Sequence, residues 1–291
     1  MASAALTGCD WSAYIDSSGE SLPVESSEDP KPSAPQEEQG TEAEPSEVPD
    51  ASKTLPEAEA SQNPEIPSGE NPENSAECPV NPGEPTVDTL AVEFVHKDFS
   101  HAEEGYFDDA LFIGDSRTVG LNRFGGIEGA TWYCDTGLSI YNCKDKILNV
   151  EGKGETTLED LLLEDSYGKI YIGMGINELG YDMNETAERY AELLERIKQL
   201  QSRAVIILMA NIHVAPGRNN KDKIYNNKNI NKLNEKLKAQ ADGVRVYYID
   251  PNPIYDDENG NLKKAYTSDD THFLGKYYPM WTEFIKEHAI Q

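Results

Sequence analysis

The chain has 291 residues and a formal net charge of −28, which together limit what it can be. Phosphate backbones are bound by Lys and Arg, and no basic stripe is present, so composition argues against nucleic-acid binding. No apolar run reaches the roughly 18 residues of a membrane-spanning helix, and none is predicted.

Acidic residues and prolines are concentrated in the first third of the chain. Residues 10–90 hold 20 acidic residues against two lysines, and 13 of the 17 prolines precede residue 91. Such a segment buries too little apolar surface to offset the entropy of ordering it. We therefore predict a disordered Pro/Glu/Ser-rich linker over 10–90 and a folded domain over 91–291.

The segment before the linker contains Leu6-Thr7-Gly8-Cys9, which resembles a bacterial lipobox. In that motif the cysteine is lipidated and becomes the mature N-terminus. Five residues precede the box, fewer than the apolar region of a signal peptide. We interpret 1–9 as the remnant of a lipoprotein signal, with a chance match as the alternative. This interpretation predicts a lipid anchor at Cys9 and a location on the extracellular face of a bacterial membrane.

The other cysteines are Cys78 in the linker and Cys134 and Cys143 in the domain. Their spacing matches no zinc pattern, so no metal is predicted, and no other cofactor is expected. Cys134 and Cys143 flank a predicted turn. They form either a disulfide, if the protein is exported, or two buried reduced thiols.

From residue 108 onward, strand-like and helix-like patterns alternate. Short, continuous apolar runs are typical of strands covered on both faces, and they fall at 110–114, 131–134, 169–174, 204–210 and 245–249. Helical spacing marks 184–202, with Asn184 as its N-cap, then 222–241 and a last helix at about 275–288. The alternation predicts an α/β domain of three layers, α/β/α, around a parallel five-stranded sheet.

Three polar stretches lie at or beyond strand ends, where open α/β sheets bind ligands. They are Gly114–Arg117, Gly173–Glu178 and Asp269–His272. A serine hydroxyl becomes nucleophilic beside a histidine base, and the histidine needs a carboxylate to orient it. Attack on an ester also creates an oxyanion, which an Asn amide can stabilise.

The three stretches, in this order, resemble the blocks of the SGNH hydrolase superfamily, also called GDSL esterases/lipases, over about residues 108–290. The resemblance implies a flavodoxin-like fold. It also implies that Ser116 is the nucleophile, His272 the general base and Asp269 its orienting partner. Asn177 would be an oxyanion donor.

The sequence departs from this family at two places. Glu178 stands where the family has Asp, beside the Asn donor. The family's second block supplies a glycine N–H to the oxyanion hole, and here Gly137 is the available glycine. An alternative alignment puts Ile140 at that position.

Several of these residues also have structural interpretations. Ser116 is a possible helix N-cap, Asp270 an alternative partner for the histidine, and His213 either packs in a loop or lines the pocket. Arg117 contacts either substrate or solvent. The aromatic residues of the last helix form either core or a sugar platform, and they are Tyr277, Tyr278, Trp281 and Phe284.

The motifs and the resemblance together predict a serine ester hydrolase acting on small acyl esters. The resemblance implies acetyl esters of cell-wall or dietary polysaccharide, or short-chain lipid esters. Two alternatives stay open: a catalytically degenerate carbohydrate-binding module, and an O-acyltransferase on the same fold. The expected partner is the ester substrate, with membrane contact only through Cys9.

Overall fold

The computed structural model describes residues 92–291, so the predicted linker and lipobox lie outside the described residues. A five-stranded sheet has the order β2-β1-β5-β6-β7, and every pairing in it is parallel. This confirms the predicted sheet, and its order is that of flavodoxin-like folds. The strands are β1 (Ala110–Gly114), β2 (Thr131–Cys134), β5 (Lys169–Gly173), β6 (Val205–Met209) and β7 (Val246–Ile249).

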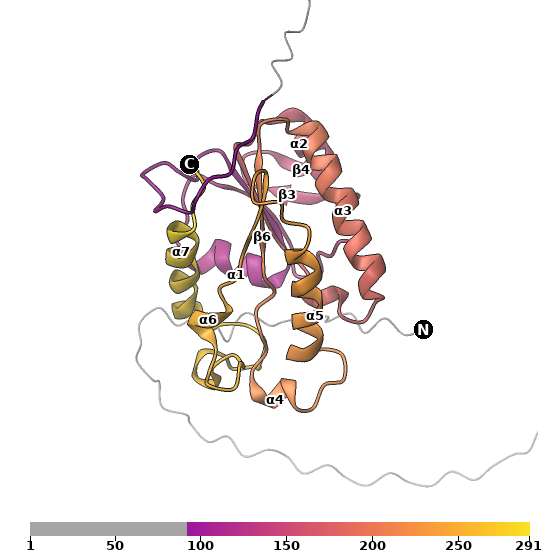
Figure 1. The fold of residues 1–291 in the computed structure, drawn as a ribbon, viewed down its shortest axis with the longest axis vertical. Coiled ribbons are helices and arrows are strands. Elements are labelled where there is room, and N and C mark those ends of the chain that lie inside the picture. Colours follow the sequence, from indigo (N-terminus) through magenta and orange to yellow (C-terminus); the bar gives the residue numbers. More distant parts are fainter. Residues whose placement is uncertain (1–91) are drawn as a thin grey trace, which may run out of the picture. The chain divides into compact units, whose positions relative to one another are not determined.

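Helices cover both faces of this sheet, as predicted. Figure 1 shows α2, α3 and α5 on one side and α1 and α7 on the other. The helices are α1 (Ser116–Phe124), α2 (Leu158–Glu164), α3 (Met183–Leu200), α4 (Pro216–Asn219), α5 (Asn227–Lys238), α6 (Asn252–Tyr255) and α7 (Tyr278–Glu287). None of the helices in residues 92–291 is long and apolar enough to cross a membrane.

The strands divide their side chains between two cores. On β1, Leu111 and Ile113 join the cluster that α3 and α5 cover, whereas Phe112 joins the cluster beneath α1 and α7. Consecutive side chains of a strand point to opposite faces, so a strand buried on both sides is apolar throughout. This explains why continuous apolar runs located all five strands.

The helix ends differ from prediction for local reasons. Asp182, not Asn184, caps α3, because its carboxylate accepts the N–H groups of Asn184 and Glu185. Helix α5 begins at Asn227 rather than 222, since Asn226 caps it. The sequence also did not indicate α1, α2 or the antiparallel pair β3 (Leu148–Val150) and β4 (Gly154–Thr156).

Cys134 and Cys143 are free thiols. The disulfide alternative is therefore wrong. Both thiols are reduced, with Cys143 buried as expected and Cys134 only partly buried. Burial raises the pKa of each thiol to about 12, which leaves both protonated and unreactive near neutral pH.

Candidate active site

The turn from β1 into α1 places Ser116 at the first residue of the helix. Asp115 is the N-cap and accepts the N–H of Arg117 at 3.0 Å, so the interpretation of Ser116 as the cap is wrong. Gly114 is needed for close packing, because a Cβ there would lie 1.9 Å from the Thr118 hydroxyl oxygen. The turn therefore holds Ser116 at the carboxyl edge of the sheet.

Ser116, His272 and Asp269 form one continuous line of contacts. Ser116 Oγ lies 2.8 Å from His272 Nε2, although 156 residues separate them, and His272 Nδ1 lies 2.6 Å from Asp269 Oδ2. Ser116 is 6% exposed and His272 4%. Such a line of contacts can supply a nucleophile, a base and an orienting carboxylate.

Asp269 is held as a carboxylate by its surroundings. Its Oδ1 accepts the N–H groups of Thr271 and His272 at 2.9 and 2.8 Å. Burial opposes ionisation, but these bonds and the imidazole hold the pKa of Asp269 well below its usual range. The ionised Oδ2 accepts the Nδ1–H of His272, which leaves Nε2 as an acceptor for the Ser116 hydroxyl.

The neighbouring Asp270 does not contact the imidazole. Its backbone has φ 65°, in the left-handed region, and its carboxylate binds Lys264 Nζ at 2.5 Å. An Asp tolerates this conformation better than most residues. Asp270 thus shapes the tight turn that brings Asp269 and His272 together.

The two predicted oxyanion donors are engaged elsewhere in the structure. Asn177 lies in a 3₁₀ turn after β5, and its amide donates to the carbonyls of Leu138 at 2.8 Å and Thr136 at 3.3 Å. The N–H of Gly137 donates to Asp135 Oδ2 at 3.2 Å. Either donor must give up such a bond to bind an oxyanion. The Ser116 N–H differs, because the first turn of a helix has no intrahelical acceptor.

Glu178 ties the loop that contains Gly137 to the end of β5. Its side chain is 1% exposed, and its Oε1 accepts the Ile140 N–H at 2.7 Å. Oε2 has no hydrogen-bond partner among residues 92–291. Burial and the nearby Asp115 raise the pKa of Glu178 to about 8. The alternative donor, the Ile140 N–H, is therefore also occupied.

His213 and Arg117 are both packed in the structure. The ring of His213 bonds Asp256 Oδ2 at 2.8 Å and Asn231 Oδ1 at 2.7 Å, as expected of a packed loop histidine. Arg117 is 3% exposed, and its Nη2 donates to the Thr271 carbonyl at 3.3 Å. Arg117 therefore does not simply extend into solvent.

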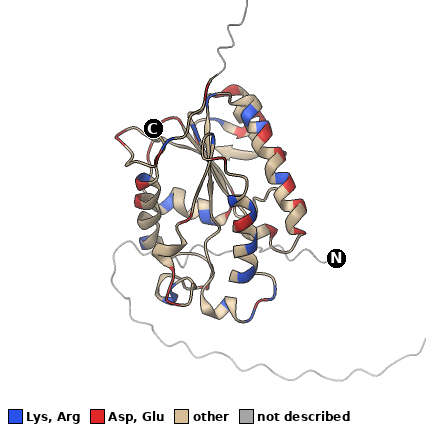
Figure 2. Ribbon diagram, viewed as in Figure 1, with Lys and Arg blue, Asp and Glu red and all other residues tan. Residues whose placement is uncertain are grey.

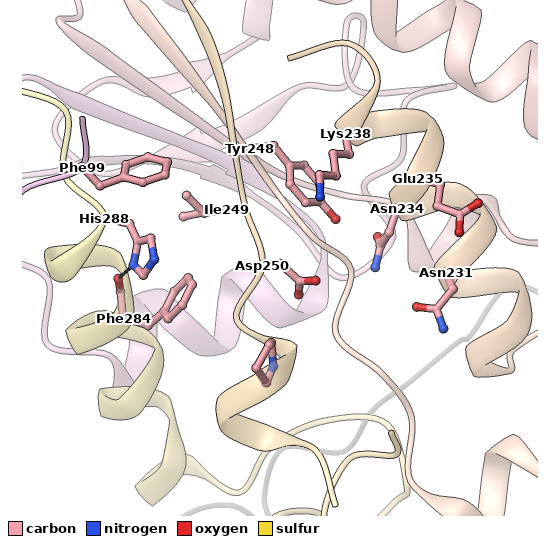
Figure 3. A pocket seen from close by; sticks show the side chains of 11 residues that line it. Phe99, Asn231, Asn234, Glu235, Lys238, Tyr248, Ile249, Asp250, Phe284 and His288 are labelled. Carbon is pink, nitrogen blue, oxygen red and sulfur yellow. Dashed lines mark hydrogen bonds between the residues drawn. The ribbon is translucent and has the colours of Figure 1, made fainter. Parts of the chain in front are cut away.

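The aromatic residues of the last helix have different environments. Tyr278 and Trp281 are buried in the core, which confirms the core interpretation for these two. Phe284 lines a hollow of about 620 Å³ beside β7, where it and His288 face side chains of α5 (Figure 3). None of the predicted site residues lines this hollow.

A second hollow, of about 410 Å³, has Asp269 in its lining. Arg218, Lys221 and Lys223 also line it, and sequence analysis had not singled them out. The available signal was three basic residues between 218 and 223 in a very acidic chain. Within residues 92–291, no group of three or more His, Cys, Asp or Glu residues is placed to hold a metal ion.

Comparisons with known proteins give one family match and several distant structures. Residues 112–278 match the model of the GDSL-like Lipase/Acylhydrolase family. A GDSL-like lipase from Bacteroides thetaiotaomicron is 20% identical, with a TM-score of 0.48 and coverage of 62% of this chain and 87% of its own. An acetylxylan esterase from Geobacillus stearothermophilus, solved as a catalytic mutant, is 16% identical, with a TM-score of 0.44 and coverage of 62% and 94%. No curated protein matches the chain.

Proposed function

Because the chain belongs to the GDSL-like lipase and acylhydrolase family, we propose that it is a serine esterase acting on small acyl esters, above all acetyl esters. The observation that carries this proposal is the line of contacts from Ser116 through His272 to the ionised Asp269. The same line of contacts supports the roles of nucleophile, general base and orienting partner, in that order.

The first half of the reaction forms an acyl-enzyme. Ser116 Oγ attacks the ester carbonyl carbon while its proton passes to His272 Nε2, and Asp269 stabilises the resulting imidazolium. The carbonyl oxygen becomes an oxyanion, which the Ser116 N–H binds at the positive end of α1. As the intermediate collapses, the bond to the alcohol breaks and Nε2 returns the proton to the leaving oxygen.

The second half releases the acid. Water attacks the acyl-serine carbonyl and gives a proton to His272 Nε2. Collapse of this second intermediate breaks the bond to Ser116 Oγ, which takes the proton back. The products are a carboxylic acid, an alcohol and the free enzyme.

We assign Asn177 and Gly137 as further oxyanion donors that act after their loop bonds open. The Asn177 amide donates to neutral carbonyls, and a charged oxyanion is a stronger acceptor than these. The Gly137 N–H donates to the Asp135 carboxylate, which keeps its bond to Lys146 Nζ when the N–H turns to the oxyanion. The nearly buried Ser116 favours an acyl group as small as acetyl. O-acetyl groups on cell-wall or dietary polysaccharide are the proposed natural esters.

The test is hydrolysis of p-nitrophenyl acetate by the wild-type protein and by Ser116→Ala. We expect the variant to lose at least about a thousandfold in kcat, and a fluorophosphonate probe to label only proteins that retain Ser116. Ser202→Ala removes an exposed serine and should stay active and labelled. Equal rates with and without Ser116, and no labelling, would instead indicate the carbohydrate-binding module.

We also propose a lipid anchor at Cys9 that places the enzyme outside a bacterial membrane. Its support is Leu6-Thr7-Gly8-Cys9 followed at once by the acidic Pro-rich segment. Mass spectrometry of the protein from its native membrane fraction should detect a diacylglyceryl group on Cys9. An unmodified, soluble product that still contains the residues before Cys9 would contradict the anchor.

A further inference from the structure

The hollow beside Asp269 carries an excess of positive charge. It lies at α4 and the loop between α4 and α5, where Figure 2 shows basic residues. Lys221 and Lys223 are exposed and form no hydrogen bond or ion pair through their ammonium groups within residues 92–291. Both ammonium groups are therefore available to an anion that enters the hollow.

The carboxylates around this hollow already have partners. Asp269 binds His272, and Asp270 binds Lys264. Asp222 accepts the N–H groups of Ile224 and Tyr225 at 2.9 and 3.0 Å and lies 3.6 Å from the Arg218 Nε. The nearby carboxylates are thus hydrogen-bonded or ion-paired to other groups, and they leave the ammonium groups of Lys221 and Lys223 to a ligand.

Two arginines hold further positive charge against the catalytic loop. Arg218 Nη1 donates to the Thr271 hydroxyl at 2.9 Å, and Arg117 Nη2 donates to the Thr271 carbonyl at 3.3 Å. Arg117 is 3% exposed, and its Nε and Nη1 have no hydrogen-bond partner among the described residues. Asp115 and Asp269 lie near the Arg117 charge, whereas Arg218 lines the hollow itself. Arg218 therefore adds to the positive charge that the two lysines present to a negatively charged ligand.

An exposed aromatic side chain lies close to the loop between α4 and α5. Tyr181 is 50% exposed and stacks on Tyr141 with ring centroids 4.2 Å apart. Ile224 of that loop is 43% exposed and packs near Gly180, the residue before Tyr181. A Cβ added to Gly180 would lie 3.8 Å from the Ile224 side chain. The apolar face of an aromatic ring packs against the C–H groups on one face of a sugar ring, so a sugar can stack on Tyr181 near the loop that contains the two lysines.

We propose that the alcohol part of the substrate is an acidic saccharide, whose carboxylate is bound by Arg218, Lys221 and Lys223 while its ester reaches Ser116. This rests on the proposed function and specifies its substrate class. The carboxylate is remote from the reacting carbonyl, so its contacts with the basic side chains stabilise the bound ground state and the transition state equally. It should lower KM more than it raises kcat.

The first experiment uses 4-acetoxybenzoate and its methyl ester, which share one scissile acetyl ester and differ by one negative charge. The quantity compared is the ratio of kcat/KM for the charged ester to that for the neutral one. Lys221→Ala combined with Lys223→Ala should lower this ratio by about five- to tenfold, mainly through KM. Lys232→Ala removes an exposed lysine on α5 whose ammonium has no ion pair among the described residues, and it should leave the ratio unchanged.

Salt and polymer substrates complete the test. Raising NaCl to about 0.5 M should bring the wild-type ratio toward that of the double variant, because salt screens exposed charges. The wild-type enzyme should release acetate faster from acetylated polygalacturonate than from the same polymer with methyl-esterified carboxylates, and the double variant should lose this preference.

A ratio that stays within about twofold in the double variant would overturn the charge assignment. Equal rates of acetate release from the two polymers would overturn the proposal that the substrate is an acidic saccharide. Both results are distinct from a failure of the proposed function, in which Ser116→Ala would hydrolyse the esters as fast as the wild type.

Discussion

At the scale of single residues, the orientation of His272 depends on Asp269 and not on the adjacent Asp270. Asp269 contacts Nδ1 at 2.6 Å, whereas Asp270 binds Lys264. Only Asp269 can therefore fix the tautomer in which Nε2 accepts the Ser116 proton. Two neighbouring acids of the same type thus provide a matched pair of positions for substitution.

We predict that Asp269→Asn lowers kcat for p-nitrophenyl acetate by about 10²- to 10⁴-fold, because an amide neither fixes the productive tautomer nor stabilises the imidazolium. Asp270→Asn should stay within about threefold, since Asn also tolerates the left-handed backbone. Steady-state kinetics on both variants, with circular dichroism as the folding check, make the comparison. Similar losses in the two variants would contradict the assignment.

Single residues also show which parts of the site could be predicted from the sequence. The spacing of Asp269 and His272 could be predicted, because three residues within one loop bring a carboxylate to its own histidine. The engagement of the Asn177 amide and the Gly137 N–H could not. Those bonds depend on how the 135–140 loop folds back on the end of β5, which no local pattern encodes.

At the scale of elements, Glu178 joins the loop after β2 to the end of β5 through the Ile140 N–H. Its pKa is raised from an ordinary 4.5 to about 8, chiefly by burial. Between these values the folded protein keeps a proton that the unfolded chain releases. The contribution of Glu178 to stability therefore falls as pH rises from about 4.5 to about 8.

We predict that Glu178→Gln removes this pH dependence and keeps the bond to Ile140, because a Gln carbonyl accepts the same N–H without ionising. At pH 9 the variant should exceed the wild type in unfolding free energy by an amount on the order of a few kcal/mol. Urea denaturation of both proteins at pH 5, 7 and 9 measures the difference. Parallel pH profiles would show that Glu178 does not titrate in this way.

Elements differed in how well the sequence indicated them. All five strands of the sheet were predicted, because burial on both faces requires continuous apolar runs. The helix α1 and the pair β3–β4 were not. Helix α1 buries Ser116, Arg117 and Thr118 beside only one large apolar side chain, Leu121, and β3 and β4 have three residues each. Neither pattern is long enough to stand out locally.

At the scale of the whole molecule, the start of the described chain is joined to its end. Ser100 and Ala289 exchange backbone hydrogen bonds of 2.9 and 3.0 Å, and the Ala102 N–H donates to the Lys286 carbonyl at 2.7 Å. The buried residues of both core clusters lie at 107 and beyond. The bonds at Ser100 and Ala102 therefore attach the segment before the core to the end of α7 and the residues that follow it.

We predict that a protein starting at residue 92 folds and hydrolyses p-nitrophenyl acetate with the kcat/KM of the full chain. A protein starting at residue 104 loses the three backbone bonds to Ala289 and Lys286, so its Tm should fall by about 5 °C or more. Thermal melts of the three lengths decide this. Equal Tm values for starts at 92 and 104 would contradict it.

The sequence by itself determined the α/β class and the five strands, and it identified Ser116, Asp269 and His272 as candidate site residues. Each depends on a local signal: a continuous apolar run, or a few polar residues directly beyond one. The tertiary structure decided that Ser116 and His272 meet, that Cys134 and Cys143 stay free, and that Glu178 holds Ile140. It also placed Arg218, Lys221 and Lys223 around the hollow that Asp269 lines. These are contacts between distant segments, which depend on how the chain packs and not on any local pattern.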